Sequence, residues 1–308
     1  MVKLLLNDIL SAVDGELAQK GDAGSCRSVS IDTRTMEPGA LFVAIRGLHY
    51  DGHGFIAQAV EGGASAVMVV DEVDVPDHVA VIRVRDTEQA LGALAAWWRN
   101  RFDIPCIAIT GSNGKSTTKE MIAAVVGSMG PVLKTEGNFN NLIGLPLTVF
   151  RWNEDHRIAV LEMGMNAPGE IDRLTRIVNP GVGVVTNVTA AHLEKLHTVE
   201  QVAGAKGELF QAMNPKGVAV INDEDPWVRS MGKRFPGTVV SFGMQNDSTV
   251  RFGHMVSEGL DSTELTFRIE SHERTVHLPL PGTHNVMNAL AAFAVGHALG
   301  LNVDDMIE

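Results

Sequence analysis

A glycine-rich segment from Thr110 to Thr118 carries the residues best suited to chemistry. It reads Thr-Gly-Ser-Asn-Gly-Lys-Ser-Thr-Thr and lies between a short apolar run and a stretch with helical periodicity. Glycines allow backbone N–H groups to wrap around phosphate oxygens, and a helix N-terminus adds partial positive charge. Lys115 can then reach the β- and γ-phosphates of a nucleotide, and the Ser116 hydroxyl can bind Mg²⁺. The segment therefore predicts a phosphate-binding loop.

The loop departs from the common GxxxxGK[ST] pattern, because Ile109 rather than glycine stands five residues before Gly114. It follows the shorter GxxGK[ST] pattern. The alternative is an ordinary glycine turn before a helix, which the matching order of strand, loop, Gly-Lys-Ser and helix disfavours. The expected nucleotide contacts are Gly111, Ser112, Asn113, Gly114, Lys115, Ser116 and Thr117.

Three further side chains are candidates for chemistry. Glu162 ends an apolar run, so we expect its carboxylate at a sheet edge near the phosphates, where it can bind Mg²⁺ directly or through water. A solvated carboxylate is the alternative. His192 follows another apolar run, although a lone histidine is more often a surface or satisfied core residue. Lys206 lies on a predicted helix, and its position alone indicates a solvated surface lysine.

Asparagines gather in two places. Asn138, Asn140 and Asn141 crowd the segment EGNFNNLIGLP, which is either a plain loop or a set of amides that contact a polar substrate. Asn285 and Asn288 are three residues apart at the start of the last predicted helix, so they share one helix face. Capping of that helix by a neighbouring residue is the structural alternative.

The elements that must position these residues alternate between strands and helices. Apolar runs followed by helix-like segments from Cys106 onward predict a mostly parallel sheet with helices on both faces. After about Asn246 the apolar residues alternate at period two, which predicts a small antiparallel sheet, and a last helix ends at Gly300. Asp86 and Gln89 resemble a capping box that opens an earlier helix. We therefore predict an α/β fold, with a small N-terminal α/β domain over residues 1–84 and a central P-loop domain over residues 85–308.

Composition narrows the class of protein. The chain has 308 residues and a formal net charge of −12, so it lacks the basic face that nucleic-acid binding needs. Two cysteines, Cys26 and Cys106, do not make a disulfide scaffold. The first apolar run is too short for a signal peptide, and no stretch approaches the ~20 apolar residues of a membrane span. These features favour a cytoplasmic protein that uses neither nucleic acid nor membrane as a partner.

Taken together, the motifs resemble the Mur ligase superfamily. Its ATP loop is similar to TGSNGKSTT, and the segments LEMGMNAPGEI, TNVTAAHLE, AKGELF and GTHNVMNALAA follow in the family's order. The segment EGNFNNLIGLPLTVF is similar to the branch that adds D-alanyl-D-alanine. The segments SVSIDTRTMEPGALFVAIRG and YDGHGFI look like the domain that holds the UDP end of the substrate. The resemblance spans essentially the whole chain.

The resemblance implies roles that position alone does not. Lys115 and Ser116 would contact ATP and Mg²⁺, and Glu162 would bind Mg²⁺. His192 would hold a second Mg²⁺, and Lys206 matches a family lysine that CO₂ carbamylates, which turns a cation into an anion. The implied catalytic residues are Lys115, Lys206 and His192, and the implied metal site is Ser116, Glu162, His192 and Lys206.

Contacts to the remaining ligands follow from the same resemblance. Asn285 and Asn288 match the motif that contacts the nucleotide. The implied substrate contacts are Thr33, Arg34, Asp51, His53, Asn138 and Asn141, of which the first four are carried over more loosely as contacts to the UDP end.

The implied function is an ATP-dependent amide-bond ligase of peptidoglycan precursor synthesis. It would join D-alanyl-D-alanine to UDP-N-acetylmuramoyl-tripeptide through an acyl phosphate, as a cytoplasmic monomer on which cell wall biogenesis, cell shape and cell division depend. The family carries a further C-terminal domain beyond the position of Glu308. We therefore expect the chain as given to bind its ligands weakly and to ligate poorly or not at all.

Other interpretations stay open. A MurE-type ligase that adds the third amino acid is one, although NFNN and the following GLPLTV favour the D-alanyl-D-alanine branch. Folylpolyglutamate synthetase shares the loop type, but the UDP-like N-terminal segment argues against it. A nucleotide-binding module or a regulatory remnant without ligase chemistry would have no need of a carbamylated Lys206.

Overall fold

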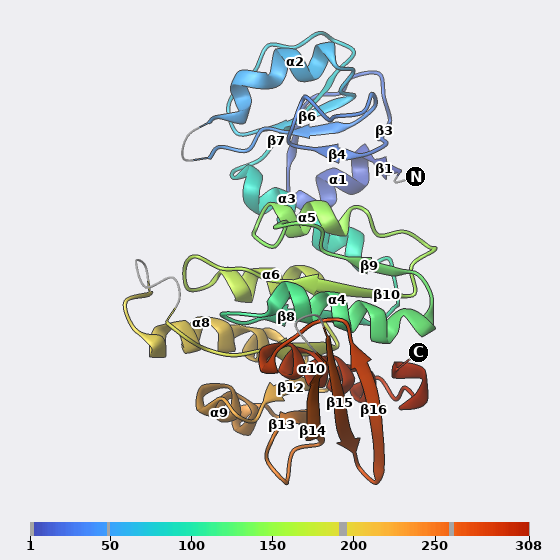
Figure 1. The fold of residues 1–308 in the computed structure, drawn as a ribbon. Helices are drawn as coiled ribbons and strands as arrows, with labels where there is room; N and C mark the ends of the chain where they lie inside the picture. Colours follow the sequence, from blue (N-terminus) through green and yellow to red (C-terminus); the bar gives the residue numbers. More distant parts are fainter. Residues whose placement is uncertain (1–2, 48–49, 191–195, 259–261, 308) are drawn as a thin grey trace. The chain divides into compact units, whose positions relative to one another are not determined.

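The computed structural model describes residues 3–47, 50–190, 196–258 and 262–307. The chain forms two compact units (Figure 1). Unit 1 consists of residues 1–103 and 142–154, and unit 2 of residues 104–141 and 155–308. The chain therefore passes between the units three times, and each unit is described by itself.

Unit 1 is built on a five-stranded sheet within the described residues, in the order β2-β7-β6-β5-β4. The neighbours from β4 to β7 run parallel, and β2 is antiparallel at the edge. Its strands are β1 (Leu4–Leu5), β2 (Glu16–Gln19), β3 (Ser25–Cys26), β4 (Val29–Ser30), β5 (Leu41–Val43), β6 (Ala66–Val69) and β7 (Ala80–Arg83). Strands β1 and β3 form a separate antiparallel pair. Its helices are α1 (Leu6–Val13), η1 (Gly52–Phe55), α2 (Ile56–Glu61), α3 (Thr87–Arg99) and α5 (Gly144–Val149).

Helix α3 begins at the cap that the sequence predicts. The Asp86 carboxylate accepts hydrogen bonds from the backbone N–H groups of Glu88 and Gln89, at 2.8 and 3.0 Å. The Gln89 amide donates to the other Asp86 oxygen at 3.1 Å, whereas in a true capping box this side chain accepts from the backbone N–H of the cap residue.

Helix α5 packs against α3 although the two are far apart in sequence. The Trp98 indole N–H donates to the Trp152 carbonyl at 3.0 Å, and the Phe102 ring stacks on the Trp152 ring with centroids 5.9 Å apart. Residues 142–154 therefore complete the core of unit 1, although the sequence around them belongs to unit 2.

Unit 2 is built on a nine-stranded sheet within the described residues, in the order β16-β15-β14-β13-β12-β11-β8-β10-β9. Its strands are β8 (Cys106–Thr110), β9 (Val132–Lys134), β10 (Ile158–Glu162), β11 (Val182–Val185), β12 (Val218–Asn222), β13 (Thr238–Gly243), β14 (Val250–Glu258), β15 (Ser262–Ile269) and β16 (His272–Leu278). Its helices are α4 (Lys115–Val125), η2 (Val126–Met129), α6 (Glu170–Val178), α8 (Val199–Ala212), α9 (Pro226–Arg234), α10 (Thr283–Ala298) and η3 (Asp304–Met306).

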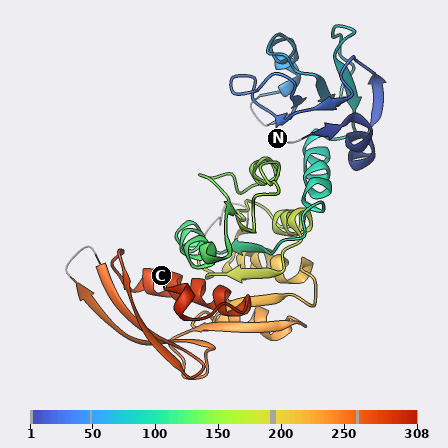
Figure 2. The ribbon, with the colours of Figure 1, turned by 90° about the vertical axis from the view of Figure 1, so that its right-hand side faces the viewer.

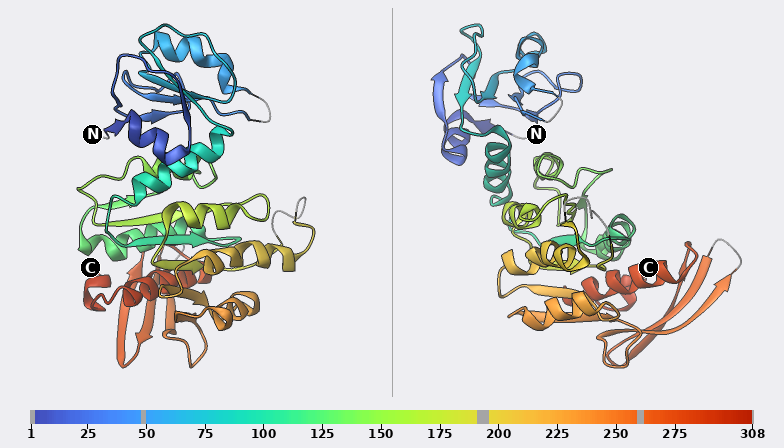
Figure 3. Two further views of the ribbon diagram at one scale, coloured as in Figure 1. Left: turned by 180° about the vertical axis from the view of Figure 1, so that it is seen from behind. Right: turned by 90° about the vertical axis from the view of Figure 1, so that its left-hand side faces the viewer.

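The predicted α/β fold is confirmed. Strands β8 to β14 pair in parallel, as continuous apolar runs buried on both faces require. The predicted antiparallel strands β14–β16 continue the edge of this same sheet. Figures 2 and 3 show them beside α10, which also packs on α4.

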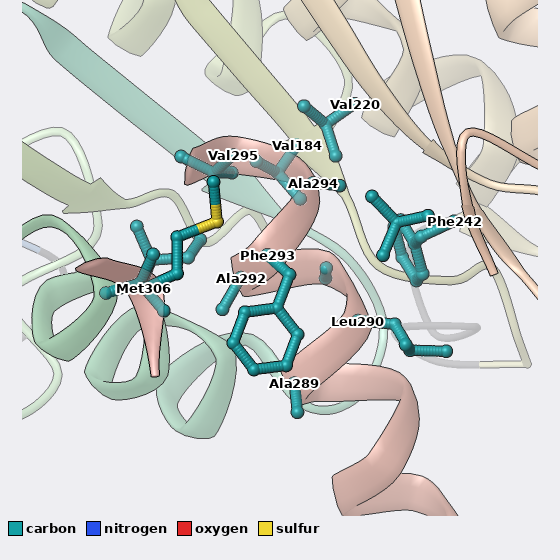
Figure 4. Packing of buried hydrophobic residues seen from close by; sticks show 14 of the residues in the cluster. Val184, Val220, Phe242, Ala289, Leu290, Ala292, Phe293, Ala294, Val295 and Met306 are labelled. Carbon is teal, nitrogen blue, oxygen red and sulfur yellow. The ribbon is translucent and has the colours of Figure 1, made fainter. Parts of the chain in front are cut away.

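The core of unit 2 gathers around α10. Figure 4 shows small and large side chains of this helix, such as Ala289, Leu290 and Phe293, packed near Val184 and Phe242 of the sheet. These side chains are at most 3% exposed. None of the helices in the described part of the chain combines the length and the apolar character that crossing a bilayer requires.

Candidate active site

The candidate site lies where the carboxyl ends of β8, β10 and β11 meet. Helix α4 connects β8 to β9 in one direction along the sheet, whereas α6 and α8 connect later strands in the other direction. Right-handed connections place these helices on opposite faces of the sheet. The ends of β8 and its neighbours therefore flank a topological switch point, where open α/β sheets bind ligands.

Two glycines of the loop after β8 are required by its shape. Gly114 has φ 78°, and a Cβ atom there would lie 2.6 Å from the Asn288 Oδ1 atom. A Cβ atom on Gly111 would lie 1.9 Å from the Thr186 hydroxyl oxygen. No larger residue fits either position without moving a neighbour. The tight turn follows directly after a buried strand and leads into α4, as the sequence predicts.

The loop is fixed from the side by residues 186–189, which follow β11. The backbone N–H of Asn113 donates to the Asn187 side-chain oxygen at 2.9 Å, and the Thr186 hydroxyl donates to the Asn113 carbonyl at 2.7 Å. The backbone N–H of Thr189 donates to the Ser112 hydroxyl at 2.9 Å. The loop is therefore preorganised by a segment more than 70 residues away in sequence.

Lys115 lies over the loop that precedes it. Its Nζ atom donates to the Gly111 carbonyl at 3.0 Å. Burial lowers the pKa of the Lys115 amine, and the attraction of the Glu162 carboxylate partly offsets this effect. Because the Lys115 amine is already partly desolvated, it can bind an anion at a lower desolvation cost than an exposed amine.

Glu162 is the centre of the polar contacts in the site. Its side chain accepts a hydrogen bond from the Ser116 hydroxyl at Oε2 and another from the Asn140 amide at Oε1, both at 2.8 Å. Its backbone N–H donates to the Thr135 hydroxyl at 2.9 Å. Glu162 is only 2% exposed, so the alternative of a solvated carboxylate is wrong.

Ser116 and Glu162 fit a magnesium ion. Neighbouring ligands of an octahedral Mg²⁺ with bonds of 2.0–2.1 Å are about 2.9 Å apart. The Ser116 and Glu162 oxygens are 2.8 Å apart and are both hard donors. Among the described residues, no group of three or more acidic, histidine or cysteine side chains is arranged so that it could hold a metal ion. A site of this kind is typical of Mg²⁺ that takes its other ligands from phosphates and water.

Lys206 is not the solvated lysine that its position indicates. It is 2% exposed on α8. Burial, and next the positive charge of Lys115, lower the pKa of Lys206 to about 7. A buried lysine with a substantial neutral fraction at neutral pH is a nucleophile.

Asn285 and Asn288 lie behind the loop, on the first turns of α10. The Asn288 Oδ1 atom accepts from the Thr118 hydroxyl at 3.1 Å, and its amide donates to Asn285 Oδ1 at 3.3 Å. The Asn285 amide donates to the Pro281 carbonyl at 2.8 Å. These contacts join the first turns of α4 and α10, and a nucleotide contact by either asparagine stays a prediction.

Thr33 and Arg34 line a pocket of about 510 Å³ in unit 1, together with Asp32, Tyr50 and Gln58. The Arg34 guanidinium pairs with both oxygens of Asp32 and holds the pKa of that carboxyl at about 2. The Arg34 side chain remains 85% exposed, so donors are left for an anionic ligand.

Asp51 and His53 act on the backbone of unit 1 instead. The Val70 N–H donates to His53 Nε2 at 3.0 Å, so the proton of the neutral ring is on Nδ1, which lies 2.6 Å from Asp51 Oδ1. The backbone N–H of His53, then its ring, and then the Arg46 guanidinium donate to Asp51 and hold the pKa of this carboxyl well below the usual range. Both residues hold the segment around η1, and their predicted contact with substrate stays a prediction.

For the remaining predicted residues, contact with substrate or metal stays a prediction. Asn138 and Asn141 are exposed in the loop after β9. His192 lies outside the described residues. Sequence reasoning noted Asn140 without assigning it to the site, yet it is the asparagine that contacts Glu162. It also missed Thr135 and Thr186, for which the only signal is their place just beyond a strand end.

Comparisons with known proteins agree with this arrangement. The Mur ligase middle domain matches residues 109–296, and the Mur ligase family catalytic domain matches residues 25–99. The UDP-N-acetylmuramoyl-tripeptide–D-alanyl-D-alanine ligase of Bacillus subtilis (strain 168) is 40% identical over 310 residues, which cover 99% of this chain and 66% of that protein.

Two solved structures share the fold. MurF from Acinetobacter baumannii has a TM-score of 0.94 at 31% identity, covering 100% of this chain and 67% of that one. The MurF ligase of Thermotoga maritima in complex with ADP has a TM-score of 0.83 at 29% identity, covering 92% of this chain and 66% of that one. The chain spans about two thirds of the length of these relatives. It belongs to the Mur ligase family.

Proposed function

We propose that this chain is the substrate-binding and ATP-binding part of a ligase that joins D-alanyl-D-alanine to UDP-N-acetylmuramoyl-tripeptide. The observation that carries the proposal is the convergence of Lys115, Ser116 and Glu162 at one sheet edge. The names of the relatives at 40% and 31% identity support the choice of substrates. The setting is peptidoglycan precursor synthesis, in the cytoplasm and as a monomer.

The reaction would proceed in two steps. The tripeptide carboxylate attacks the γ-phosphate of ATP, which gives an acyl phosphate and ADP. The amine of D-alanyl-D-alanine then attacks the acyl carbon, loses a proton and expels phosphate. Lys115 and the N–H groups of the loop would offset the charge of two anions as they approach. ADP in the complex of the Thermotoga maritima relative supports nucleotide binding.

Ser116 and Glu162 would hold Mg²⁺, which supplies positive charge opposite the phosphates. The 2.8 Å separation of their oxygens supports this assignment. The second Mg²⁺ that the resemblance implies would involve Lys206 and His192. Asn140 would keep the Glu162 carboxylate turned toward Ser116, because it donates to the other carboxylate oxygen.

A carbamate on Lys206 would resolve an electrostatic conflict. Lys115 and Lys206 repel each other when both are charged, and this repulsion contributes to the low pKa of Lys206. The neutral amine of Lys206 can add to CO₂ and lose a proton, which leaves a carbamate anion. Repulsion between the two side chains would then become attraction, in a position suited to a metal cation.

The pocket around Thr33 and Arg34 would hold the UDP end of the substrate. Its volume of about 510 Å³ suits a nucleotide, and Arg34 offers donors to a diphosphate. The N-terminal domain proposed over residues 1–84 would thus bind substrate, and the central domain proposed over residues 85–308 would bind ATP.

Phosphate release tests the proposal. The 308-residue chain, alone and extended by any coding sequence that follows it, would receive ATP, Mg²⁺, UDP-N-acetylmuramoyl-tripeptide and D-alanyl-D-alanine. Omission of each substrate is the control. We expect release only when both substrates are present and much more of it from an extended version.

Two outcomes would overturn the assignment. Release with the dipeptide precursor and a diamino acid would move it to the MurE type. Nucleotide binding without any release would favour a binding module. A Lys115→Ala variant with full ATP-dependent activity would remove the phosphate-loop assignment itself.

A further inference from the structure

Helix α4 buries a second lysine, Lys119, which the proposed reaction does not use. Its side chain is 4% exposed, and its Nζ atom lies 2.6 Å from the Thr135 carbonyl oxygen and 3.1 Å from Glu120 Oε1. A buried ammonium costs free energy unless it is paired and hydrogen-bonded. The Lys119 amine therefore needs these two partners. Of the two, Thr135 is fully buried, whereas the Glu120 side chain is exposed.

Thr135, the residue directly after β9, uses its carbonyl, its N–H and its hydroxyl in hydrogen bonds. Its carbonyl accepts from Lys119, its N–H donates to the Val160 carbonyl at 3.3 Å, and its hydroxyl accepts from the backbone N–H of Glu162 at 2.9 Å. The hydroxyl contact fixes the backbone at the residue whose carboxylate faces Ser116.

These contacts form a closed circuit, which we name the Glu162 ring. It runs from Ser116 to the Glu162 carboxylate, from the Glu162 N–H to the Thr135 hydroxyl, and from the Thr135 carbonyl to Lys119. Ser116 and Lys119 are three residues apart on α4, so they lie on one helix face. Both the side chain and the backbone of Glu162 are thus tied to the helix that begins at the phosphate loop.

We propose that Lys119 is a positioning residue for the metal site, and that it acts through Thr135 to hold the Glu162 carboxylate opposite Ser116. The inference rests on the proposed role of Glu162 as a Mg²⁺ ligand. Residues that orient a metal ligand without touching the metal change metal affinity by about 10–100-fold when they are replaced. A lysine that only supports the fold would not affect magnesium in particular.

The test measures ADP affinity of the 308-residue chain by calorimetry, once with Mg²⁺ and once with EDTA. The ratio of the two affinities is the magnesium gain. The variants are Lys119→Met, which removes the donor, and Thr135→Val, which removes the hydroxyl at nearly constant volume. Thr135→Ser restores the hydroxyl. Lys134→Met is the matched control, because the Lys134 amine also pairs with Glu120, whereas it is the Lys119 amine that donates to the Thr135 carbonyl.

We expect the magnesium gain of Lys119→Met and of Thr135→Val to be about tenfold smaller than that of the unmodified chain. Their ADP affinity in EDTA should stay close to that of Lys134→Met. That control removes the same charge as Lys119→Met, from a side chain that is more exposed to solvent, and it leaves the Glu162 ring intact. Thr135→Ser should retain the magnesium gain. If Lys119→Met does not fold, equal losses of ADP affinity by Thr135→Val with Mg²⁺ and with EDTA would still overturn the inference, because Lys119 is proposed to act only through Thr135.

Equal losses with Mg²⁺ and with EDTA would assign Lys119 to the fold and overturn the inference. A Glu162→Gln variant separates this failure from failure of the proposed function. If Glu162→Gln loses the magnesium gain and Lys119→Met and Thr135→Val keep it, the inference alone is wrong. If Glu162→Gln keeps the gain, Glu162 is not the ligand, and the proposed metal site falls together with the inference.

Discussion

Two lysines of the site, Lys115 and Lys206, are separated by 91 positions in the sequence, yet the positive charge of Lys115 disfavours the charged form of Lys206. Burial is the larger cause of the low pKa of Lys206, and the charge of Lys115 adds to it. Such a conflict is costly for stability and is typical of functional sites. It makes the protonation of Lys206 a property that can be measured through folding.

Replacement of Lys206 by Met should change how stability depends on pH. The pKa of Lys206 is about 7 in the folded chain, against about 10.4 in an unfolded one. Between these values the unfolded chain binds a proton that the folded chain releases, so this group makes stability rise with pH from about 7 to about 10, by up to about 1.4 kcal/mol per unit. Below pH 7 its contribution no longer changes.

Urea unfolding at pH 7, 8 and 9 in CO₂-free buffer measures this effect. Lys206→Met should exceed the wild-type chain in stability most at pH 7, and the difference should shrink as the pH rises. Parallel pH profiles for the two proteins would show that Lys206 has an ordinary pKa in the folded chain.

At the scale of elements, the phosphate loop depends on glycine where the backbone turns. Gly114→Ala should lower the melting temperature and weaken ADP binding, because the residue has φ 78° and its Cβ would lie 2.6 Å from Asn288 Oδ1. The left-handed conformation alone costs about 1–2 kcal/mol for a residue with a side chain. Gly127→Ala is the control, since a Cβ there meets nothing within 4 Å. An ADP affinity that Gly114→Ala leaves unchanged would contradict the described loop geometry.

The start of α3 offers a prediction within unit 1. Asp86→Ala should destabilise that unit by about 1 kcal/mol, because two backbone N–H groups at the helix start lose their acceptor. Asp86→Asn should be nearly neutral, since asparagine caps helices about as well as aspartate does. Thermal unfolding followed by circular dichroism measures both. Equal losses in the two variants would point to the charge rather than the cap.

Much of the fold can be predicted from elements of this kind. Short apolar runs such as β8 and β10 are buried on both faces, so their composition alone indicates parallel strands. Helix α5 could not be predicted, because its six residues include Pro146 and its stability comes from packing on α3. Helix propensity does not predict a helix whose stability comes from tertiary contacts.

The site is less readable from sequence than the fold. The loop around Lys115 is local in the chain, so its motif identifies it. The contact between Ser116 and Glu162 joins residues 46 positions apart, and the burial of Lys206 depends on how α8 packs. Only the resemblance to a family pointed to Lys206, because an isolated lysine on a helix carries no sign of burial.

At the scale of the whole molecule, the two units should respond to different ligands. Mg²⁺ with ADP should slow hydrogen exchange in unit 2, around residues 111–118 and 186–189, because the loop and its supporting segment lie there. UDP should slow exchange in unit 1, around residues 31–34, which line the other pocket. Hydrogen exchange with mass spectrometry measures both. Protection of residues 31–34 by ADP, or of the loop by UDP, would contradict the proposed division of roles.

The three passages of the chain between the units also bear on how the protein is made. Residues 142–154 supply Trp152, which stacks on Phe102 and accepts the hydrogen bond from Trp98. During synthesis, unit 1 cannot close its core until residue 154 has left the ribosome. By then the phosphate loop and α4 have already emerged, but strands β10 to β16 of their sheet have not yet emerged. Unit 1 can therefore complete its core before the sheet of unit 2 can form. A fragment that ends at residue 103 would lack residues 142–154, so it would lack part of the core of unit 1.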